Sequence, residues 1–469
     1  MSAALPISPT LRFEQGTLVL DGWSRMAIEK VFGSQVWSWD ARISAWRAVA
    51  ARYPEVVDAL ATKAVGTVDQ TAQWQAVNWA RVELPVLRSE QSTAVDKWLA
   101  TRRGLIVMPT GTGKTEVALQ IMALTRCSTL VVAPIRDLMY QWHQRIVRAL
   151  DYDSGIIGDN VFNSRAVSVT TYDSACIHMP QLGNRFKLLI FDECHHLPGQ
   201  MRSDAARMSI APWRLGLSAT PERADGRHSL FDELIGPELY RLNIDSVRGH
   251  TLANYTVFRI PVHLSAQEQE RYDQLGQEIR EFFYAMKQED SSFTWEKLCA
   301  QSATDAPARR ALAAYRAKQA IEDRAEEKFR ILEDLFRLHQ GTPMIVFAGS
   351  NAMARDVSRR FLLPCLLSHC GKRERLDYLD GLRSGIYPAI IANQVLDEGV
   401  DIPAVKIAVV IGGMASTKQA QQRLGRILRK TGTHSAILYE VVCQDTNEAT
   451  KSRKRRASDA YARTRHRRL

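Results

Sequence analysis

A segment rich in glycine and threonine near residue 110 lies between an apolar run and an amphipathic run. The apolar residues 105–107 predict a buried strand, and residues 116–124 predict the start of a helix, which is the context that a P-loop requires. Backbone N–H groups at the start of that helix would face the phosphates of a nucleoside triphosphate. The segment therefore predicts a nucleotide site, in the sequence Met108, Pro109, Thr110, Gly111, Thr112, Gly113, Lys114, Thr115.

The residues of this loop have separate expected roles. Gly111 and Gly113 let the backbone approach the phosphates closely, and Lys114 is placed to reach the β- and γ-phosphates as a point charge. The Thr115 hydroxyl is expected to ligate Mg²⁺. Met108 replaces the glycine with which the strict pattern begins. A Gly/Thr-rich turn with an incidental lysine is the alternative, and the flanking strand and helix patterns disfavour it.

Length and composition predict several globular domains inside the cell. A chain of 469 residues is too long for one ordinary core, and its hydrophobic content of 45% supports packing. No run of eighteen apolar residues occurs, and no charged segment precedes an apolar core at the N-terminus, so we expect neither a membrane span nor a secretory signal. Seven scattered cysteines without a C-x-x-C pair are typical of reduced thiols. We expect a cytoplasmic, nucleoid-associated location, or a nuclear one in a eukaryote.

Positive charge is concentrated at the C-terminal end of the chain. Residues 451–469 hold nine lysines and arginines and one acid, Asp459, whereas the rest of the chain is nearly neutral. A flexible arm of this kind gains affinity for nucleic acid through release of counterions from the phosphates. A solvated terminus without a role is the second interpretation, and composition does not separate the two.

Short apolar runs fall into two blocks that alternate with helical segments. Such runs, apolar on both faces, are typical of parallel sheets covered by helices, so the predicted fold class is α/β with two parallel-sheet domains in tandem. The runs cover residues 105–107, 130–133, 167–171, 188–191 and 215–217 in the first block, and 344–347, 389–392, 407–411 and 436–441 in the second.

Two other regions have different patterns. Between the blocks, Ser265 and Glu268 form a capping-box signature before a helix that reaches about residue 287, and a second helical run covers about 306–338. This helical insertion acts either as a lever on a bound ligand or only as packing against one domain. The first 84 residues hold six of the ten tryptophans, which either form an aromatic core or stack on bases: Trp23, Trp37, Trp39, Trp46, Trp74 and Trp79.

A pair of acids, Asp192 and Glu193, follows the apolar run 188–191 and precedes Cys194 and His195. Ligands of α/β sheets bind at the carboxyl ends of the strands, so this pair is expected near the P-loop. Asp192 is placed to hold Mg²⁺, and Glu193 to orient or deprotonate the attacking water. In the second block, Arg426 and Arg429 lie three residues apart on one predicted helix face, where both would reach the same γ-phosphate.

These motifs resemble, in order, those of superfamily 2 helicases over about residues 85–445. The resemblance implies ATP and Mg²⁺ as cofactors and two RecA-like domains that meet across one nucleotide. Residues 87–91 resemble the Q-motif region, where Arg88 and Gln91 are implied to bind the nucleotide and Gln91 to read the adenine edge. Segments that resemble motifs Ia and Ib are implied to touch the nucleic-acid backbone, through Pro134, Gln141, Thr171 and Tyr172.

Further motifs complete the resemblance. Ser218 and Thr220 belong to a Ser-Ala-Thr segment like motif III, which links the nucleotide state to the grip on the strand. Residues 347–350 lie at motif IV. Residues 393–401 resemble motif V, with Gly399 and Asp401 implied to bind the nucleotide and Asp401 to approach the ribose. Residues 422–429 resemble motif VI, which implies that Gln422 binds the nucleotide and that Arg426 and Arg429 are arginine fingers.

Within the superfamily the chain is most similar to the XPB branch. Residues 234–240, 252–255 and 423–429 look like XPB-type sequence, and residues 39–42 with 46–47 resemble the start of the XPB damage-recognition domain. Arg223, Ala224 and Asp225 stand where XPB proteins carry Arg-Glu-Asp. The predicted domains are an N-terminal domain (1–84), a first RecA-like domain (85–262), a helical, thumb-like insertion (263–338), a second RecA-like domain (339–446) and a basic tail (447–469).

The resemblance implies an ATP-dependent DNA helicase or translocase with 3′ to 5′ polarity, acting on single-stranded, forked or duplex DNA and serving DNA repair. Three alternatives stay open. The first is the motor subunit of a restriction or defence complex that translocates without unwinding. The second is an ATP-gated DNA clamp that recruits a nuclease partner, and for any of these functions the partner is a nuclease or a repair complex. The third is an RNA remodelling protein, because the Asp-Glu-Cys-His box also occurs in RNA helicases.

Overall fold

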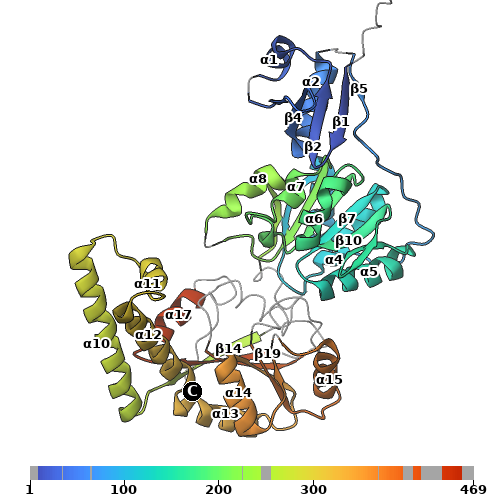
Figure 1. Cartoon of the computed structure of the whole chain (residues 1–469). Coiled ribbons are helices and arrows are strands. Elements are labelled where there is room, and N and C mark those ends of the chain that lie inside the picture. Colours follow the sequence, from blue (N-terminus) through green and yellow to red (C-terminus); the bar gives the residue numbers. More distant parts are fainter. Residues whose placement is uncertain are drawn as a thin grey trace, which may run out of the picture. The chain divides into compact units, whose positions relative to one another are not determined.

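The fold is known from a computed structural model that divides the chain into two compact units, Met1–Asn243 and Ile244–Leu469 (Figure 1). The first unit holds a small five-stranded sheet and an eight-stranded sheet, and the second holds a six-stranded sheet and a helical segment. The structure describes residues 9–33, 35–63, 66–223, 225–243, 255–367, 369–393, 405–412 and 436–456.

The N-terminal domain is a five-stranded sheet in the order β3-β4-β2-β1-β5, with two helices. The strands are β1 (Thr10–Glu14), β2 (Thr17–Asp21), β3 (Ser38–Asp40), β4 (Ala45–Val49) and β5 (Val68–Asp69), and the helices are α1 (Arg25–Phe32) and α2 (Tyr53–Thr62). Trp23, Trp37 and Trp46 are buried in its core, as the core interpretation predicted, whereas Trp39 is 52% exposed. Trp39 packs edge-on against Trp46 from the neighbouring strand.

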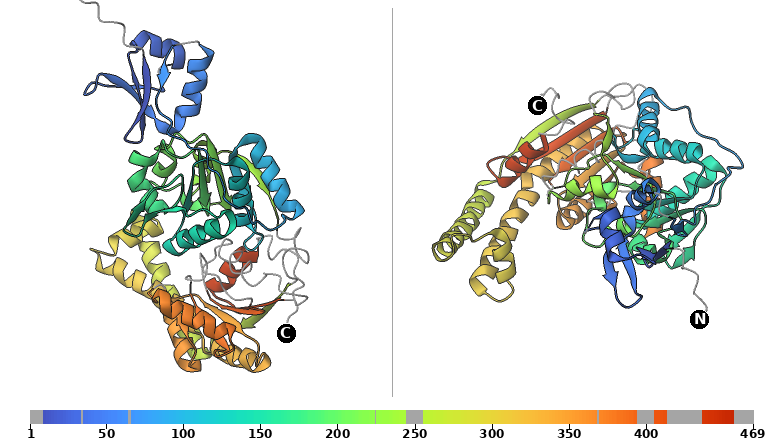
Figure 2. Two further views of the ribbon diagram at one scale, coloured as in Figure 1. Left: turned by 90° about the vertical axis from the view of Figure 1, so that its right-hand side faces the viewer. Right: turned by 90° about the horizontal axis from the view of Figure 1, so that it is seen from above.

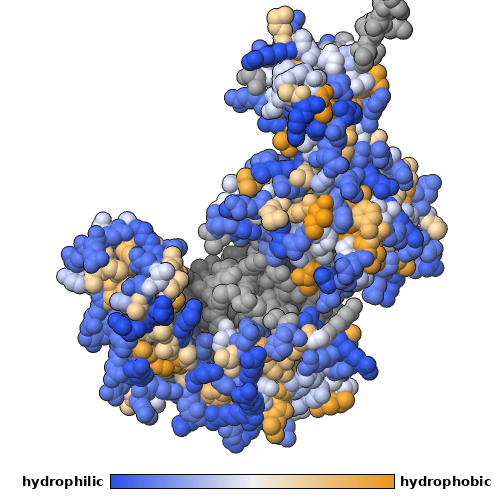
Figure 3. Space-filling view, viewed as in Figure 1, coloured by the Kyte–Doolittle hydropathy of each residue, from blue (hydrophilic) through white to orange (hydrophobic). Residues whose placement is uncertain are grey.

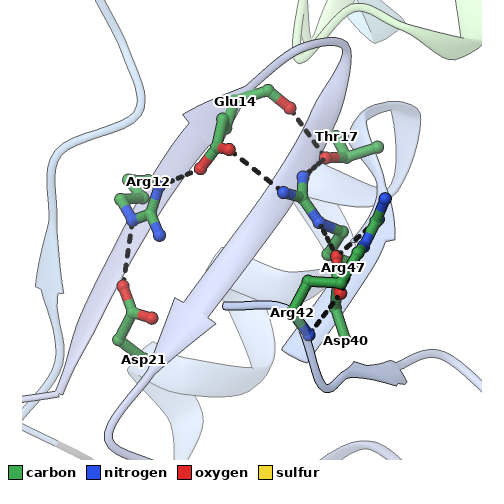
Figure 4. A network of polar contacts seen from close by, with 7 residues as sticks. All are labelled: Arg12, Glu14, Thr17, Asp21, Asp40, Arg42 and Arg47. Atoms are coloured by element: carbon green, nitrogen blue, oxygen red, sulfur yellow. Dashed lines mark hydrogen bonds and ion pairs between the residues drawn. The ribbon is translucent and has the colours of Figure 1, made fainter. Parts of the chain in front are cut away.

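A network of ion pairs covers the polar face of this small sheet (Figure 4). Asp40 accepts hydrogen bonds from Arg42 and Arg47, which hold its pKa well below the usual range. Arg47 also bonds to Glu14, and Arg12 pairs with Glu14 and Asp21. Three residues of this network, Asp40, Arg42 and Arg47, belong to the segments 39–42 and 46–47 that resemble the damage-recognition domain. Their ion pairs connect β3, the β3–β4 turn and β4.

The first RecA-like sheet has the strand order β13-β6-β12-β11-β7-β10-β8-β9, parallel except for the β8–β9 pair. Its strands are β6 (Arg103–Val107), β7 (Thr129–Ala133), β8 (Gly155–Gly158), β9 (Val161–Asn163), β10 (Val167–Thr171), β11 (Leu188–Asp192), β12 (Trp213–Ser218) and β13 (Glu238–Arg241). All five apolar runs that we predicted as strands of this sheet lie in it, because residues apolar on both faces are buried under helices on both sides.

Helices cover both faces of this sheet (Figure 2). Alternate strand residues such as Ile106 and Val131 pack on one face, against α3 (Ser89–Thr101), α4 (Lys114–Thr125) and α5 (Arg136–Leu150). The residues between them, such as Leu105 and Leu130, pack on the other face. That face carries α6 (Tyr172–Leu182), α7 (Asp204–Arg207) and α8 (Phe231–Leu234).

Contacts join the small domain to the first RecA-like sheet. Ile210, which lies just before β12, is fully buried in the core of the N-terminal domain. Asn184 donates a hydrogen bond to the carbonyl of Thr71, and its own carbonyl accepts one from the N–H of Gln73. Arg214 is fully buried and donates to three backbone carbonyls, two of them at Ser209 and Ala211, which flank Ile210.

The second RecA-like sheet is parallel, with the order β14-β19-β18-β15-β17-β16. Its strands are β14 (Tyr255–Val262), β15 (Met344–Ala348), β16 (Cys365–Leu366), β17 (Ala389–Ala392), β18 (Ile407–Ile411) and β19 (Ala436–Cys443). Strand β14 pairs with β19, so it lies in this sheet and not in the first domain, where our boundary at residue 262 placed it. The sequence did not reveal this because the partner strand lies far along the chain.

The helical segment is shorter than we predicted. Helix α10 (Ala266–Glu289) lies along α12 (Ala306–Arg324), with α11 (Trp295–Gln301) between them in sequence and a small core that includes Phe293 and Leu298. The predicted run 306–338 breaks at Ala325, and α13 (Glu326–Leu338) then packs into the core of the second sheet. The other helices in the described part of this unit are α14 (Asn351–Phe361), α15 (Lys372–Arg383) and α17 (Asn447–Arg456).

The surface shows the mixture of residues that is usual in globular proteins. Hydrophobic residues are scattered over the mainly hydrophilic face in Figure 3. Among the described residues, no helix is both long enough and apolar enough to cross a bilayer.

Candidate nucleotide and nucleic-acid site

The predicted motifs of the first domain gather at one edge of its sheet. Strands β6, β12, β11, β7 and β10 are parallel neighbours in this order, so their carboxyl ends lie along the same edge. The P-loop follows β6, the Ser-Ala-Thr segment ends β12, and the acid pair ends β11. The motif Ia and Ib segments follow β7 and β10. The nucleotide motifs and the nucleic-acid motifs therefore occupy neighbouring stretches of one edge.

Two glycines in left-handed conformations shape the backbone of the predicted P-loop. Gly111 and Gly113 adopt left-handed φ values of 85° and 84°, which a residue without a Cβ adopts at little cost. Lys114 begins α4, and its Nζ donates to the carbonyl of Met108 at 3.2 Å and lies 3.9 Å from Glu193 Oε1. The loop lysine and one acid of the predicted pair therefore meet, as the sequence predicted.

Arg88 and Gln91 support the P-loop from helix α3. The Gln91 amide is buried, its Nε2 donates to the carbonyl of Thr112 at 3.0 Å, and its Oε1 accepts the backbone N–H of Arg88. Arg88 also donates to the carbonyl of Thr112. The resemblance implied that Gln91 reads the adenine edge. In this structure, its donor and its acceptor bind the protein backbone instead, because the capping box turns the side chain toward the loop.

Asp192 is held by two donors in a buried position. Its Oδ1 accepts the N–H of Glu193 at 3.0 Å, and its Oδ2 accepts the indole N–H of Trp142 at 2.8 Å. Burial and the nearby charge of Glu193 raise the pKa of Asp192 above its usual range, while the hydrogen bond from Trp142 opposes this shift. The sequence did not predict that Trp142 contacts Asp192, although a buried indole N–H usually finds an acceptor, and this requirement could have pointed to a polar partner.

Glu193 lies in a strained turn directly after β11, next to His195. Its φ of 46° and ψ of 54° are left-handed values that cost a non-glycine residue about 1–2 kcal/mol. The Nδ1 atom of His195 lies 3.4 Å from Glu193 Oε2 and 3.2 Å from the hydroxyl of Ser218. Arg223 donates to the carbonyl of His195 and pairs with Asp225. The acid pair, the Ser-Ala-Thr segment and the Arg-Ala-Asp segment are thus physically connected.

Several side chains of the segments that resemble motifs Ia, Ib and III are buried, and for Pro134, Thr171 and Tyr172 this corrects the expected contact of the side chain with nucleic acid. Tyr172 is fully buried, and its hydroxyl donates to the carbonyl of Asp192 at 2.9 Å, so the side chain supports the acid pair. The Thr171 hydroxyl caps helix α6. These residues lie at or directly beyond the ends of buried strands, where side chains join the core. The buried set comprises Pro134, Thr171, Tyr172, Ser218 and Thr220, whereas Gln141 and Arg223 are partly exposed.

Other predicted residues lie outside the described residues. They are Ala224 and the residues expected in motifs V and VI, namely Gly399, Asp401, Gln422, Arg426 and Arg429.

The described groups fit a magnesium-bound nucleoside triphosphate. The hydroxyl of Thr110 is buried and has no hydrogen-bond partner within the ranges that the structure describes. The Lys114 ammonium and the N–H groups at the start of α4 are donors suited to phosphate. Thr115 in the first turn of α4 and Asp192 carry the oxygen atoms that Mg²⁺ prefers. This fold and site define a P-loop nucleoside triphosphatase built on RecA-like sheets.

Comparison with known proteins identifies the family. Models described as "Type III restriction enzyme, res subunit", "ERCC3/RAD25/XPB C-terminal helicase" and "Xeroderma pigmentosum group B helicase damage recognition domain" match residues 84–223, 310–459 and 11–70. The DNA 3′-5′ translocase XPB2 of Sulfurisphaera tokodaii is 37% identical over 89% of this chain and 95% of its own length. The chain belongs to the XPB family of superfamily 2 helicases, which confirms the resemblance found in the sequence.

More distant relatives agree with this assignment. The DNA 3′-5′ helicase XPB of Kineococcus radiotolerans is 27% identical over 77% of this chain, and the match spans 60% of that protein. The helicase domain of Hef from Pyrococcus furiosus has a similar fold, with a TM-score of 0.56 and 16% identity over 78% of this chain and 97% of that domain. The predicted fold class, two RecA-like domains with a small N-terminal domain and a helical insertion, is confirmed.

Proposed function

We propose that this protein is an ATP-driven DNA motor that moves 3′ to 5′ and serves DNA repair. The proposal rests on the position of Lys114 beside the acid pair at the edge of the sheet, where Lys114 Nζ lies 3.9 Å from Glu193 Oε1. The family assignment and the printed names of the relatives support the DNA substrate and the polarity. The match of residues 11–70 to a damage recognition domain supports the role in repair.

The residues of the first domain divide the work of hydrolysis. Lys114 and the loop N–H groups would hold the phosphates, and Thr115 and Asp192 would hold Mg²⁺, which supplies positive charge beside the transferred phosphoryl group. Glu193 lies close enough to Lys114 to orient water at the γ-phosphate. Asp192 is the last residue of β11, and Glu193 follows it in a left-handed backbone conformation that ends the strand.

Coupling to DNA uses the neighbouring motifs. Arg223 donates to the carbonyl of His195 and pairs with Asp225. His195 contacts both Glu193 and the hydroxyl of Ser218, so a movement of Glu193 would be transmitted to the Ser-Ala-Thr segment through one residue. Gln141 on α5 and the backbone at Pro134 and Thr171 would contact the strand. The proposal also includes nucleotide binding by Gly399, Asp401 and Gln422, and it assigns Arg426 and Arg429 as arginine fingers. Movement along the DNA strand would follow the loss of the γ-phosphate contacts.

A second candidate is a motor that translocates on duplex DNA without separating its strands. The relative with 37% identity is named a translocase, whereas several others are named helicases. A strand-displacement assay on forked DNA separates the two, because a translocase hydrolyses ATP on duplex DNA but releases no strand.

Partners are also part of the proposal. Relatives from Arabidopsis thaliana are named as subunits of the general transcription and DNA repair factor IIH. We propose by analogy that this protein acts beside a repair-complex or nuclease partner, near DNA in the cytoplasm or nucleus.

Steady-state ATP hydrolysis tests the function directly. The wild type and the Lys114→Ala and Glu193→Gln variants are compared without nucleic acid and with single-stranded DNA, duplex DNA, forked DNA and RNA. We expect stimulation by DNA, and its loss in both variants. Activity retained in both variants would refute the site, a preference for RNA would refute the substrate, and low unstimulated hydrolysis would favour an ATP-gated clamp.

A further inference from the structure

The indole of Trp142 reaches the carboxylate of Asp192 from a different element of the fold. Trp142 lies near the middle of α5, is 2% exposed, and donates from Nε1 to Asp192 Oδ2 at 2.8 Å. The other carboxylate oxygen, Oδ1, accepts the N–H of the next residue, Glu193. Each oxygen of this carboxylate therefore has one donor, and Trp142 supplies the one that comes from outside the acid pair's own segment.

Two donors in different directions determine how a carboxylate is oriented. The terminal torsion of aspartate is broad, so one hydrogen bond leaves rotation about it largely free. A second donor on the other oxygen removes that freedom. An ionised carboxylate accepts at about four lone-pair sites, so these two bonds leave lone pairs for a cation. Indole is a neutral donor and adds no positive charge that would compete with a metal ion.

We propose that Trp142 is a positioning residue that holds the Asp192 carboxylate in the orientation that binds Mg²⁺. The inference rests on the proposed function, in which Asp192 is a Mg²⁺ ligand. Partners that orient a metal ligand from outside the coordination shell raise metal affinity typically by about 10- to 100-fold. Trp142 thus sets the tightness of Mg²⁺-dependent nucleotide binding, apart from its packing in the core.

Another tryptophan provides the matched control for packing. Trp98 belongs to the same hydrophobic core, is fully buried, and donates its indole N–H to the carbonyl of Arg214 at 3.0 Å. Replacing Trp98 or Trp142 by Phe removes one buried indole and one hydrogen bond. Of these two tryptophans, Trp142 is the one whose indole donates to Asp192.

The test measures nucleotide binding without turnover. A fluorescent ADP analogue is titrated into the full chain with Mg²⁺ and in EDTA, and the ratio of the two dissociation constants gives the Mg²⁺-dependent gain. For Trp142→Phe we expect this gain to fall about 10-fold, with EDTA affinity within about 2-fold of the wild type. Trp98→Phe should leave the gain unchanged. An unchanged gain in Trp142→Phe, or an equal loss in both variants, would overturn the inference.

Two further variants keep the outcome interpretable. Site-specific incorporation of the isosteric 3-benzothienyl analogue at position 142 removes the N–H and keeps the ring shape, so it tests the bond if Trp142→Phe does not fold. Asp192→Asn tests the proposed function separately and should abolish the Mg²⁺-dependent gain. If Asp192→Asn keeps the gain, the metal assignment fails. If Asp192→Asn abolishes the gain but both changes at position 142 leave it unchanged, the metal assignment stands and the positioning role of Trp142 fails.

Discussion

The buried ion pair between α13 and α17 allows a quantitative test of stability. Lys328 is fully buried, and its Nζ lies 2.7 Å from Oε2 of Glu448, which is also buried. The same carboxylate oxygen accepts the N–H of Cys443 at the end of β19, at 2.9 Å. Replacing Lys328 by Met removes the charge and keeps a chain of similar length. It leaves the Glu448 carboxylate buried without its counter-charge.

The expected loss is large. Removing one partner of a buried ion pair costs about 3–5 kcal/mol in the free energy of unfolding. In a unit the size of Ile244–Leu469, each kcal/mol lowers the melting temperature by about 2–4 °C. We therefore expect Lys328→Met to lower the melting temperature of this unit by about 6–20 °C.

Calorimetric melting of the full chain measures this effect. Lys297→Met is the matched control, because Lys297 also pairs with a carboxylate, Asp290, at 2.5 Å, but both side chains are 44% exposed. Water screens an exposed pair, so its removal should change stability little. Adding Glu448→Leu to Lys328→Met should recover most of the loss, since no unpaired charge then remains buried. A loss no larger than that of Lys297→Met, or no recovery in the double variant, would refute the reasoning.

Three further predictions concern other parts of the chain. Ile210→Asp places a carboxylate in the core of the N-terminal domain and should expose the segment before α3 to trypsin, whereas Met26→Asp, at a site 81% exposed, should not. Gln91→Leu removes the bond to the Thr112 carbonyl and should raise the KM for ATP several-fold with a smaller change in kcat; an unchanged KM would contradict its supporting role. Truncation after Arg456 removes residues 457–469 but keeps Ser452, whose buried hydroxyl donates to Glu440. This truncation should weaken DNA binding and make that binding less dependent on salt concentration. Unchanged affinity and slope would assign the tail no role in DNA binding.

The chemistry-bearing segments could be predicted because their signals are local. The P-loop needs glycines, a lysine and flanking strand and helix patterns within a few residues, and the acid pair needs only an apolar strand before it. The side-chain partners could not be predicted in the same way. The bond of Tyr172 to the Asp192 carbonyl and that of Trp142 to the Asp192 carboxylate depend on which strands are neighbours, and one sequence does not specify that order.

The α/β class, the order of the motifs, the expected place of the nucleotide site and the helicase family could all be inferred from the sequence, since each is encoded in short contiguous patterns. The pairing of β14 with β19, the bond of Gln91 to the P-loop and the bond of Trp142 to Asp192 are visible in the folded chain alone. Parallel pairing and buried hydrogen bonds of this kind join residues that lie far apart in the sequence. Their free energy is gained only when the whole core forms.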